Sequence, residues 1–174
     1  MPNLSEEEII NGCLKNNRMA QKALYDQYKT NMYTLSYRIT NNFEDANDVL
    51  QEGFTQVFEN LKSFKGTSQL ATWIHTIIAR AALKKIKHRI RFEELTEVED
   101  SHPIDWGSVI DVQHLEKAIA SLPDGYRSVF TLYEIEGFKH REIAEMMNFS
   151  VNTSKTQLHK AKRMLQAKLN KNRK

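Results

Sequence analysis

Apolar side chains recur every three or four residues along most of this chain, the spacing that lines one face of an α-helix. No segment alternates convincingly between apolar and polar residues, as a half-buried strand does. We therefore predict an all-α fold. The expected helices cover residues 6–15, 19–39, 43–61, 69–90, 115–121, 126–136 and 142–147, with a last helix from about 153.

Capping residues flank several of these segments. Ser5 and Glu8 have the spacing of a capping box, and Asn42 is placed to cap the helix that follows it. Gly137 is expected to end the 126–136 helix in a left-handed conformation. Gly53 lies inside a helix, where it costs about 1 kcal/mol relative to alanine. Either a neighbouring backbone approaches closely there, or the helix tolerates the loss.

One segment without helical spacing divides the chain. Residues 93–112 contain Pro103, Gly107 and a run of seven acidic residues. Proline, glycine and like charges together are typical of a linker. The chain is therefore expected to hold two small helical domains, at 1–92 and 113–174, joined by an acidic linker.

Composition narrows the class of protein. The chain has 174 residues, of which 40% are hydrophobic and 27% charged, as in globular proteins. Cys13 is the single cysteine, which favours a reducing cytoplasm. No signal peptide or membrane span is indicated. The six histidines are scattered and no glycine-rich phosphate loop occurs, so we predict neither an enzyme nor a metal or other cofactor.

Charge is segregated along the chain. Residues 44–59 hold five acids and no lysine or arginine, whereas 80–91 hold six basic residues and no acid. Residues 150–174 hold eight more basic residues and again no acid. Two basic blocks separated by an acidic one suggest two sites for a polyanion such as DNA. Solvated helix faces and a basic tail explain the charge pattern about equally well.

The end of the chain has the order of a helix-turn-helix. A short helix at 142–147 and a turn at 148–152 precede the last helix, the arrangement whose second helix enters the DNA major groove. Val151, Leu158, Ala161 and Leu165 share one face and are expected to pack inward. The other face carries Lys155, Thr156, His159 and Lys160, with Lys162 and Arg163 suited to backbone phosphates. An ordinary helical hairpin with a polar face is the alternative.

Motifs in both halves carry a family resemblance. The C-terminal half reads LPDGYRSVF at 122–130, EIA at 142–144 and VNTSKTQLHKAKRML at 151–165. The N-terminal half reads DANDVLQEGF at 45–54, then FKG at 64–66 and WI at 73–74. In this order the chain resembles an extracytoplasmic-function (ECF, group IV) sigma factor of the sigma-70 family. The resemblance implies region 2 at 1–92 and region 4 at 113–174. It also implies a transcription initiation factor that binds core RNA polymerase and directs it to promoters.

The resemblance assigns roles to individual residues. The residues implied to bind core polymerase are Asp45, Asp48, Gln51 and Glu52. Those implied to contact the −10 element are Phe64, Lys65, Gly66, Thr67, Ser68, Gln69, Arg80, Lys84 and Lys87, with Lys85 and Arg89 beside the same duplex, and Trp73 is expected in the core. Those implied to contact the −35 element are Lys155, Thr156, His159, Lys160, Lys162 and Arg163. The linker is implied to thread into the polymerase channel, and an anti-sigma factor is a further implied partner.

The chain departs from the family pattern at several positions. Arg80 stands where members often carry asparagine, and a guanidinium cannot accept a hydrogen bond. Lys139 replaces the usual serine or threonine, so the capping box with Glu142 is expected to be lost. Ser154 replaces a valine, and His159 an aromatic or basic residue.

One alternative function remains open from the sequence. A stand-alone helix-turn-helix regulator, with N-terminal helices that dimerise or bind a ligand, would share the C-terminal motif. It would not explain the second basic block or the −10-like segment.

Overall fold

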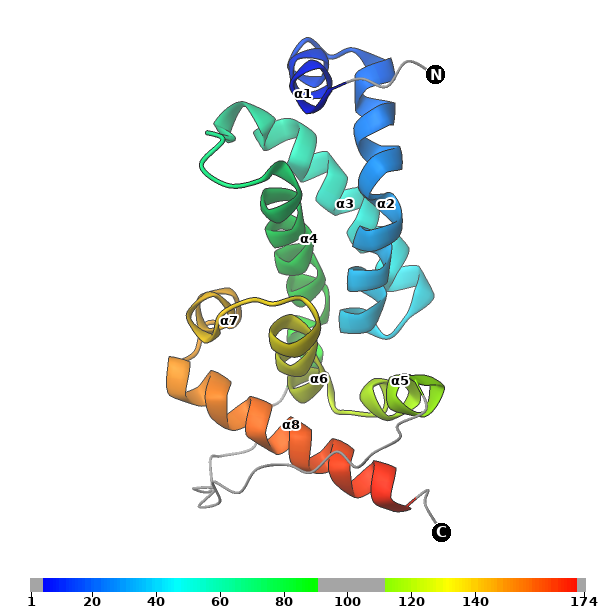
Figure 1. Cartoon of the computed structure of the whole chain (residues 1–174), viewed down its shortest axis with the longest axis vertical. Coiled ribbons are helices and arrows are strands. Elements are labelled where there is room, and N and C mark those ends of the chain that lie inside the picture. Colours follow the sequence, from blue (N-terminus) through cyan, green and yellow to red (C-terminus); the bar gives the residue numbers. More distant parts are fainter. Residues whose placement is uncertain (1–4, 91–111, 172–174) are drawn as a thin grey trace. The chain divides into compact units, whose positions relative to one another are not determined.

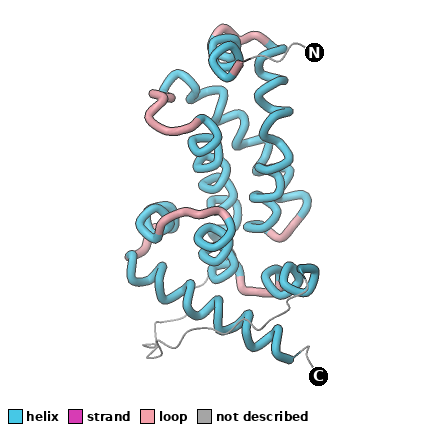
Figure 2. The backbone as a smooth tube through the Cα atoms, viewed as in Figure 1, coloured by secondary structure: helices cyan, strands magenta, loops and turns pink. Residues whose placement is uncertain are grey.

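The computed structural model describes residues 5–90 and 112–171. Within these ranges every regular element is helical, which confirms the all-α prediction (Figure 2). The chain divides into two compact units, Met1–Lys85 and Ile86–Lys174. Most of the acidic segment at 93–112 lies outside the described residues. No helix in the described part of the chain has both the length and the apolar character needed to cross a membrane.

The N-terminal unit contains four helices: α1 (Glu6–Leu14), α2 (Arg18–Thr40), α3 (Phe43–Asn60) and α4 (Leu70–Ile86), the last of which ends at the unit boundary. A 3-10 turn, η1 (Leu61–Ser63), follows α3. Helix α2 packs along α3 and also against α1 (Figure 1). The side chains that fill this core are fully buried, among them Leu24, Leu35, Ile39, Val49, Ile74 and Ile78.

Local capping sets the helix limits as the sequence indicates. The Ser5 Oγ accepts a hydrogen bond from the Glu8 N–H at 3.2 Å, and the Glu8 Oε2 accepts one from the Ser5 N–H at 2.7 Å. Asn41 ends α2 in the left-handed region, with φ 52°. The Asn42 Oδ1 then accepts from the Asp45 N–H at 2.9 Å and starts α3. Both capping predictions are confirmed.

Helix α4 is shorter than predicted. It runs over Leu70–Ile86 rather than 69–90, and a second 3-10 turn, η2 (Lys87–Arg89), follows it. Trp73, which we expected in the core, is only partly buried. Its ring lies 5.4 Å from the ring of Phe64, so it packs against the loop that precedes α4 instead.

At Gly53, helix α3 leaves no room for a side chain against α4. A Cβ atom at this position would lie 2.3 Å from the Ile78 Cδ1. The atom that occupies the space is therefore a side-chain methyl of α4 and not a neighbouring backbone. Because Ile78 is fully buried, that methyl has little room to move.

The C-terminal unit contains α5 (Val112–Ala120), α6 (Asp124–Phe130), α7 (His140–Met147) and α8 (Val151–Lys171). Helix α8 packs against α5, α6 and α7. The predicted 126–136 helix begins earlier, and its second half is a π-helical turn, η3 (Thr131–Ile135). Gly137 follows with φ 76°, which confirms the left-handed residue expected there.

Helix α8 begins two residues earlier than predicted, because the Ser150 Oγ accepts from the Thr153 N–H at 3.0 Å. Leu158, Ala161 and Leu165 are buried as predicted. Val151 was expected to pack inward and is instead 38% exposed. The buried position in the first turn belongs to Ser154.

The contact at Gly53 predicts an energetic coupling between α3 and α4. Gly53→Ala should destabilise the protein by up to about 2 kcal/mol, because overpacking costs about 1–3 kcal/mol and the helix propensity of alanine offsets about 1 kcal/mol. Ile78→Val removes the Cδ1 and should cost about 0.5–1.5 kcal/mol alone. In the Gly53→Ala background it should cost at least about 1 kcal/mol less. Urea unfolding of the four proteins measures this coupling, and strictly additive effects would contradict it.

Candidate nucleic-acid and protein interfaces

The predicted polymerase-binding residues share the solvent side of α3. Asp48, Gln51 and Glu52 are exposed and Asp45 is half-buried. The helical period places them opposite the face that packs into the core. That buried face consists of Ala46, Val49, Leu50, Gly53, Phe54 and Val57. The helix thus separates an apolar face from a polar face that is acidic along most of its length.

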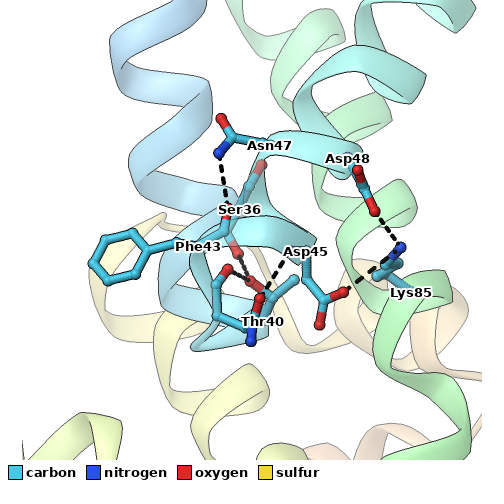
Figure 3. Close-up of polar contacts among 8 residues, drawn as sticks. Ser36, Thr40, Phe43, Asp45, Asn47, Asp48 and Lys85 are labelled. Carbon is cyan, nitrogen blue, oxygen red and sulfur yellow. Dashed lines mark hydrogen bonds and ion pairs between the residues drawn. The ribbon is translucent and has the colours of Figure 1, made fainter.

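Two lysines of α4 lie against this acidic face. The Lys85 Nζ is 2.8 Å from the Asp48 Oδ2 and 3.6 Å from the Asp45 Oδ1 (Figure 3). The Lys84 Nζ is 3.2 Å from the Glu52 Oε1. The hydrogen bond with Asp48 raises the pKa of Lys85 against the opposing effect of burial, and the charges of Asp48 and Asp45 raise it further. Three of the four residues assigned to polymerase binding are therefore paired within the chain.

This pairing is what the sequence reasoning missed. The sequence reasoning assigned the acidic residues of α3 to core polymerase, and Lys84 and Lys85 to DNA. The paired groups are 32 and 37 residues apart in the chain, so no helical spacing connects them. The only signal in the sequence was that an acidic block and a basic block of similar length lie on successive helices.

The predicted −10 residues fall into a loop and a helix face. Lys65, Gly66, Thr67, Ser68 and Gln69 are all exposed, in the loop between η1 and α4. Gly66 has φ 69°, a conformation that side chains disfavour. The half-buried Phe64 anchors one end of the loop through its ring contact with Trp73. A polar, exposed loop on a fixed aromatic base can present hydrogen-bonding groups to a base.

The basic −10 residues follow the loop. Arg80 and Lys84 are exposed and lie one turn apart on α4. Lys87 is exposed in η2. Lysine and arginine on successive turns suit the spacing of backbone phosphates.

The predicted −35 residues on α8 differ in accessibility. Lys155 and Arg163 are exposed, while Thr156, His159, Lys160 and Lys162 are half-buried. The Thr156 hydroxyl donates to the Asn152 carbonyl at 3.0 Å, and the buried His159 Nε2 has no hydrogen-bond partner among residues 5–90 and 112–171. Lys162 forms an ion pair with Glu134 of η3. The side chains on the outward face of α8 thus differ in their accessibility to a partner, whereas the helical period alone predicts that all of them are exposed.

A polar contact joins the two helices of the helix-turn-helix. The His140 Nδ1 lies 2.8 Å from the Oγ of Ser154, whose side chain is fully buried. The His140 ring also stacks on Tyr133, with centroids 4.2 Å apart. Burial lowers the pKa of His140, and the charges of Lys155 and Lys162 lower it further against the opposing charge of Glu134. The imidazole is therefore neutral at pH 7 and the contact with Ser154 is a neutral hydrogen bond.

The start of α7 corrects another expectation. The Glu142 Oε2 accepts a hydrogen bond from the Lys139 N–H at 2.7 Å. A lysine side chain has no acceptor, so the reciprocal bond of a serine or threonine cap cannot form. Half of the capping box therefore survives, where we predicted that it is lost.

No cluster of histidine, cysteine and carboxylate side chains suited to a metal ion occurs in residues 5–90 and 112–171. The groups just described offer charge, hydrogen bonds and shape to a partner. The hydroxyl that contacts a histidine among them, that of Ser154, is fully buried and so is not presented to a substrate.

Comparisons with protein families match both units. The family model "Sigma-70 region 2" matches residues 24–92, and "Sigma-70, region 4" matches residues 113–165. Helices α3 and α4 lie in the first match, and α7 lies in the second with most of α8.

Several curated proteins are similar over most of this chain. The ECF RNA polymerase sigma factor SigE of Mycolicibacterium smegmatis is 30% identical over 152 residues, which are 82% of this chain and 58% of that protein. The chain thus spans just over half the length of this relative. The RNA polymerase sigma factor YlaC of Bacillus subtilis is 28% identical, with 86% of this chain and 92% of that protein covered. The ECF RNA polymerase sigma factor SigW of the same organism is 27% identical, with 84% and 87% covered.

Solved structures share the fold. The sigma factor RpoE, in complex with the anti-sigma factor NepR from Bartonella quintana, aligns with a TM-score of 0.59 at 21% identity. That alignment covers 86% of this chain and 96% of the other. CnrH, in complex with the cytosolic domain of CnrY, aligns with a TM-score of 0.56 at 20% identity, covering 93% and 95%.

The lowered pKa of His140 predicts a pH dependence of stability. The unfolded chain binds a proton at the ordinary pKa of 6.5, and the folded protein binds it only at lower pH. The free energy of unfolding should therefore fall as the pH drops below about 6.5. His140→Gln keeps a hydrogen bond to Ser154 but cannot titrate, so its stability should fall less between pH 7 and 5. Denaturant unfolding at several pH values tests this, and parallel curves for the two proteins would contradict it.

Proposed function

Since this chain belongs to the extracytoplasmic-function group of the sigma-70 family, we propose that it binds core RNA polymerase through α3 and promoter DNA through two separate surfaces. A sigma factor directs RNA polymerase to specific promoters, and it is a transcription initiation factor rather than an enzyme. We place region 2 at 1–92, an acidic linker at 93–112 and region 4 at 113–174. The proposed site of action is the cytoplasm.

The solvent face of α3 is the observation that carries the proposal. Asp45, Asp48, Gln51 and Glu52, the residues that resemble the family's polymerase-binding motif, all lie on it. An acidic face on a rigid helix complements a basic protein surface in charge, and such complementarity speeds association and fixes register. A rigid helix also loses little conformational freedom on binding.

The exposed loop at 65–69 and the half-buried Phe64 support contact with the −10 element. A base that is flipped out of the DNA needs a pocket and polar groups that read its edge. The loop offers lysine, threonine, serine and glutamine side chains close together. Arg80, with donors only, suits a phosphate or a guanine edge better than the asparagine it replaces.

Helix α8 supports contact with the −35 element. Lys155, Thr156, His159 and Lys160 are the candidates for base edges, and Lys162 and Arg163 for phosphates. Because Lys162 is paired with Glu134, a phosphate that contacts this lysine competes with that carboxylate or shares the ammonium group with it. An anti-sigma factor is a further proposed partner, because the related RpoE structure contains one.

The binding surfaces predict two separable defects. Asp48→Arg with Gln51→Ala should abolish co-elution with sigma-free core polymerase, because both changes fall on the proposed docking face. Affinity for a −35 DNA fragment should be retained. Lys155→Glu with Lys160→Glu should have the opposite effects. Size exclusion and fluorescence anisotropy measure the two activities.

The opposite pattern would refute the residue assignments. If the wild-type protein also fails to bind polymerase from its own source, the proposed function itself is wrong.

The ion pairs between α3 and α4 predict that neutralising the paired acids of α3 strengthens DNA binding more than neutralising acids of the same helix outside these pairs. Asp48→Asn with Glu52→Gln removes two negative charges, releases Lys84 and leaves Lys85 with Asp45 alone. Glu44→Gln with Glu59→Gln removes the same charge from the same helix, at exposed positions. The first variant should bind single-stranded DNA about two- to threefold more tightly than the second, with a steeper dependence on salt. Anisotropy titrations over a range of salt concentrations test this, and equal affinities would show that only net charge matters.

A further inference from the structure

An exposed aromatic side chain stands at the start of the same helix. Phe43, the first residue of α3, is 65% exposed. The other large apolar side chains that are exposed in the described part of the chain are aliphatic, namely Leu14, Met19, Val112, Ile135 and Val151. A large aromatic ring that stays mostly exposed gains little from folding, and such rings are enriched where proteins meet partners.

The ring is held in place. It stacks on the ring of Tyr37 from α2, with centroids 4.7 Å apart and planes 25° from parallel. The Asn47 side chain donates to the Phe43 carbonyl at 3.0 Å, which fixes the first turn of α3 (Figure 3). An aromatic pair fixed in this way offers contact area without the entropy cost of ordering a mobile side chain.

The corner beneath the ring is also rigid. The hydroxyl of Thr40, a fully buried side chain, contacts the Ser36 carbonyl at 2.8 Å and the Asn42 carbonyl at 3.2 Å (Figure 3). These contacts connect the last turn of α2 to the residue that caps α3. The position of Phe43 is thus set by the packing of two helices.

The helical period relates Phe43 to the acidic face. Positions 43, 47 and 51 follow one another at four-residue intervals, and so form one edge of the exposed face of α3. Asp45 and Glu52 form the other edge, where Lys84 and Lys85 pair with them. Asp48 lies between the two edges. The face therefore has a border of lysine pairs beside α4 and an aromatic border beside α2.

We propose that the Tyr37–Phe43 pair is part of the surface that docks core RNA polymerase, where it receives an arginine or aliphatic side chain of a basic polymerase surface. Charge complementarity identifies the occupant, because residues 44–59 carry five acids and no lysine or arginine. An arginine suits the aromatic pair, since its guanidinium stacks on aromatic rings, and other basic groups of the same partner surface can pair with the carboxylates at the far edge of the face. This inference rests on the proposed function and adds a hydrophobic anchor to it.

The test compares two equally exposed side chains. Phe43→Ala should weaken binding to core polymerase at least about fivefold, the effect of losing an interface anchor. Met19→Ala removes an apolar side chain from α2 that is 66% exposed, and it should change binding less than about twofold. Phe43→Tyr keeps the ring and should bind within about twofold of the wild-type protein. Titration of labelled protein with core polymerase gives the dissociation constants, and thermal unfolding confirms that each variant is folded.

The outcomes separate the two proposals. If Phe43→Ala binds as tightly as Met19→Ala while Asp48→Arg with Gln51→Ala abolishes binding, the aromatic anchor is refuted and the polymerase-binding face stands. If Phe43→Ala alone loses affinity, the anchor is supported. If neither the anchor nor the acidic variants change binding, both proposals are wrong.

Discussion

The close approach of α3 and α4 at Gly53 is the constraint on which the polar face of the N-terminal unit depends. With no side chain at this position, the Ile78 methyl fills the space and sets the register of two antiparallel helices. Because the two helices are antiparallel, residues that precede Gly53 on α3 lie beside residues that follow Ile78 on α4. The same register therefore brings Lys84 beside Glu52, and Lys85 beside Asp48 and Asp45. A buried packing contact thus decides which surface charges meet.

These ion pairs change how the charge blocks of the sequence should be interpreted. An acidic block and a basic block are separate sites along the chain, but in the fold they share a border. The pairs are solvated and screened by salt, so their effect on stability is small. Their effect on binding is larger in principle, because a partner that takes the carboxylates leaves the lysines available to phosphates. Under the proposed assignments, binding of polymerase and binding of DNA are linked, and such a linkage is reciprocal.

Features set by neighbouring residues could be predicted from the sequence, and features set by packing could not. The caps at Ser5 and Asn42 and the left-handed Gly137 depend on a few adjacent residues, and all were predicted correctly. The start of α8 was misplaced because Ser150 caps the helix. Val151 was assigned to the core by its spacing from Leu158, Ala161 and Leu165, although it lies in the exposed first turn. The π-helical turn at Thr131–Ile135 and the lysine pairs depend on contacts between distant segments, which a spacing rule cannot detect. The candidate residues on α8 were found through helical spacing and the others through family resemblance, while their actual neighbours required the fold.

One departure from the family pattern, Ser154, makes sense only together with its partner. A serine in place of valine at position 154 would leave a buried hydroxyl unsatisfied, at a cost of about 1–3 kcal/mol. His140 supplies the missing partner from α7, and Tyr133 covers the imidazole ring. A hydrogen bond is more directional than an apolar contact, so the pair fixes the angle between the two helices of the helix-turn-helix more narrowly than valine would. A substitution that looks unfavourable by itself can therefore restrict the orientation of the DNA-reading helix, provided that its partner stays neutral and in place.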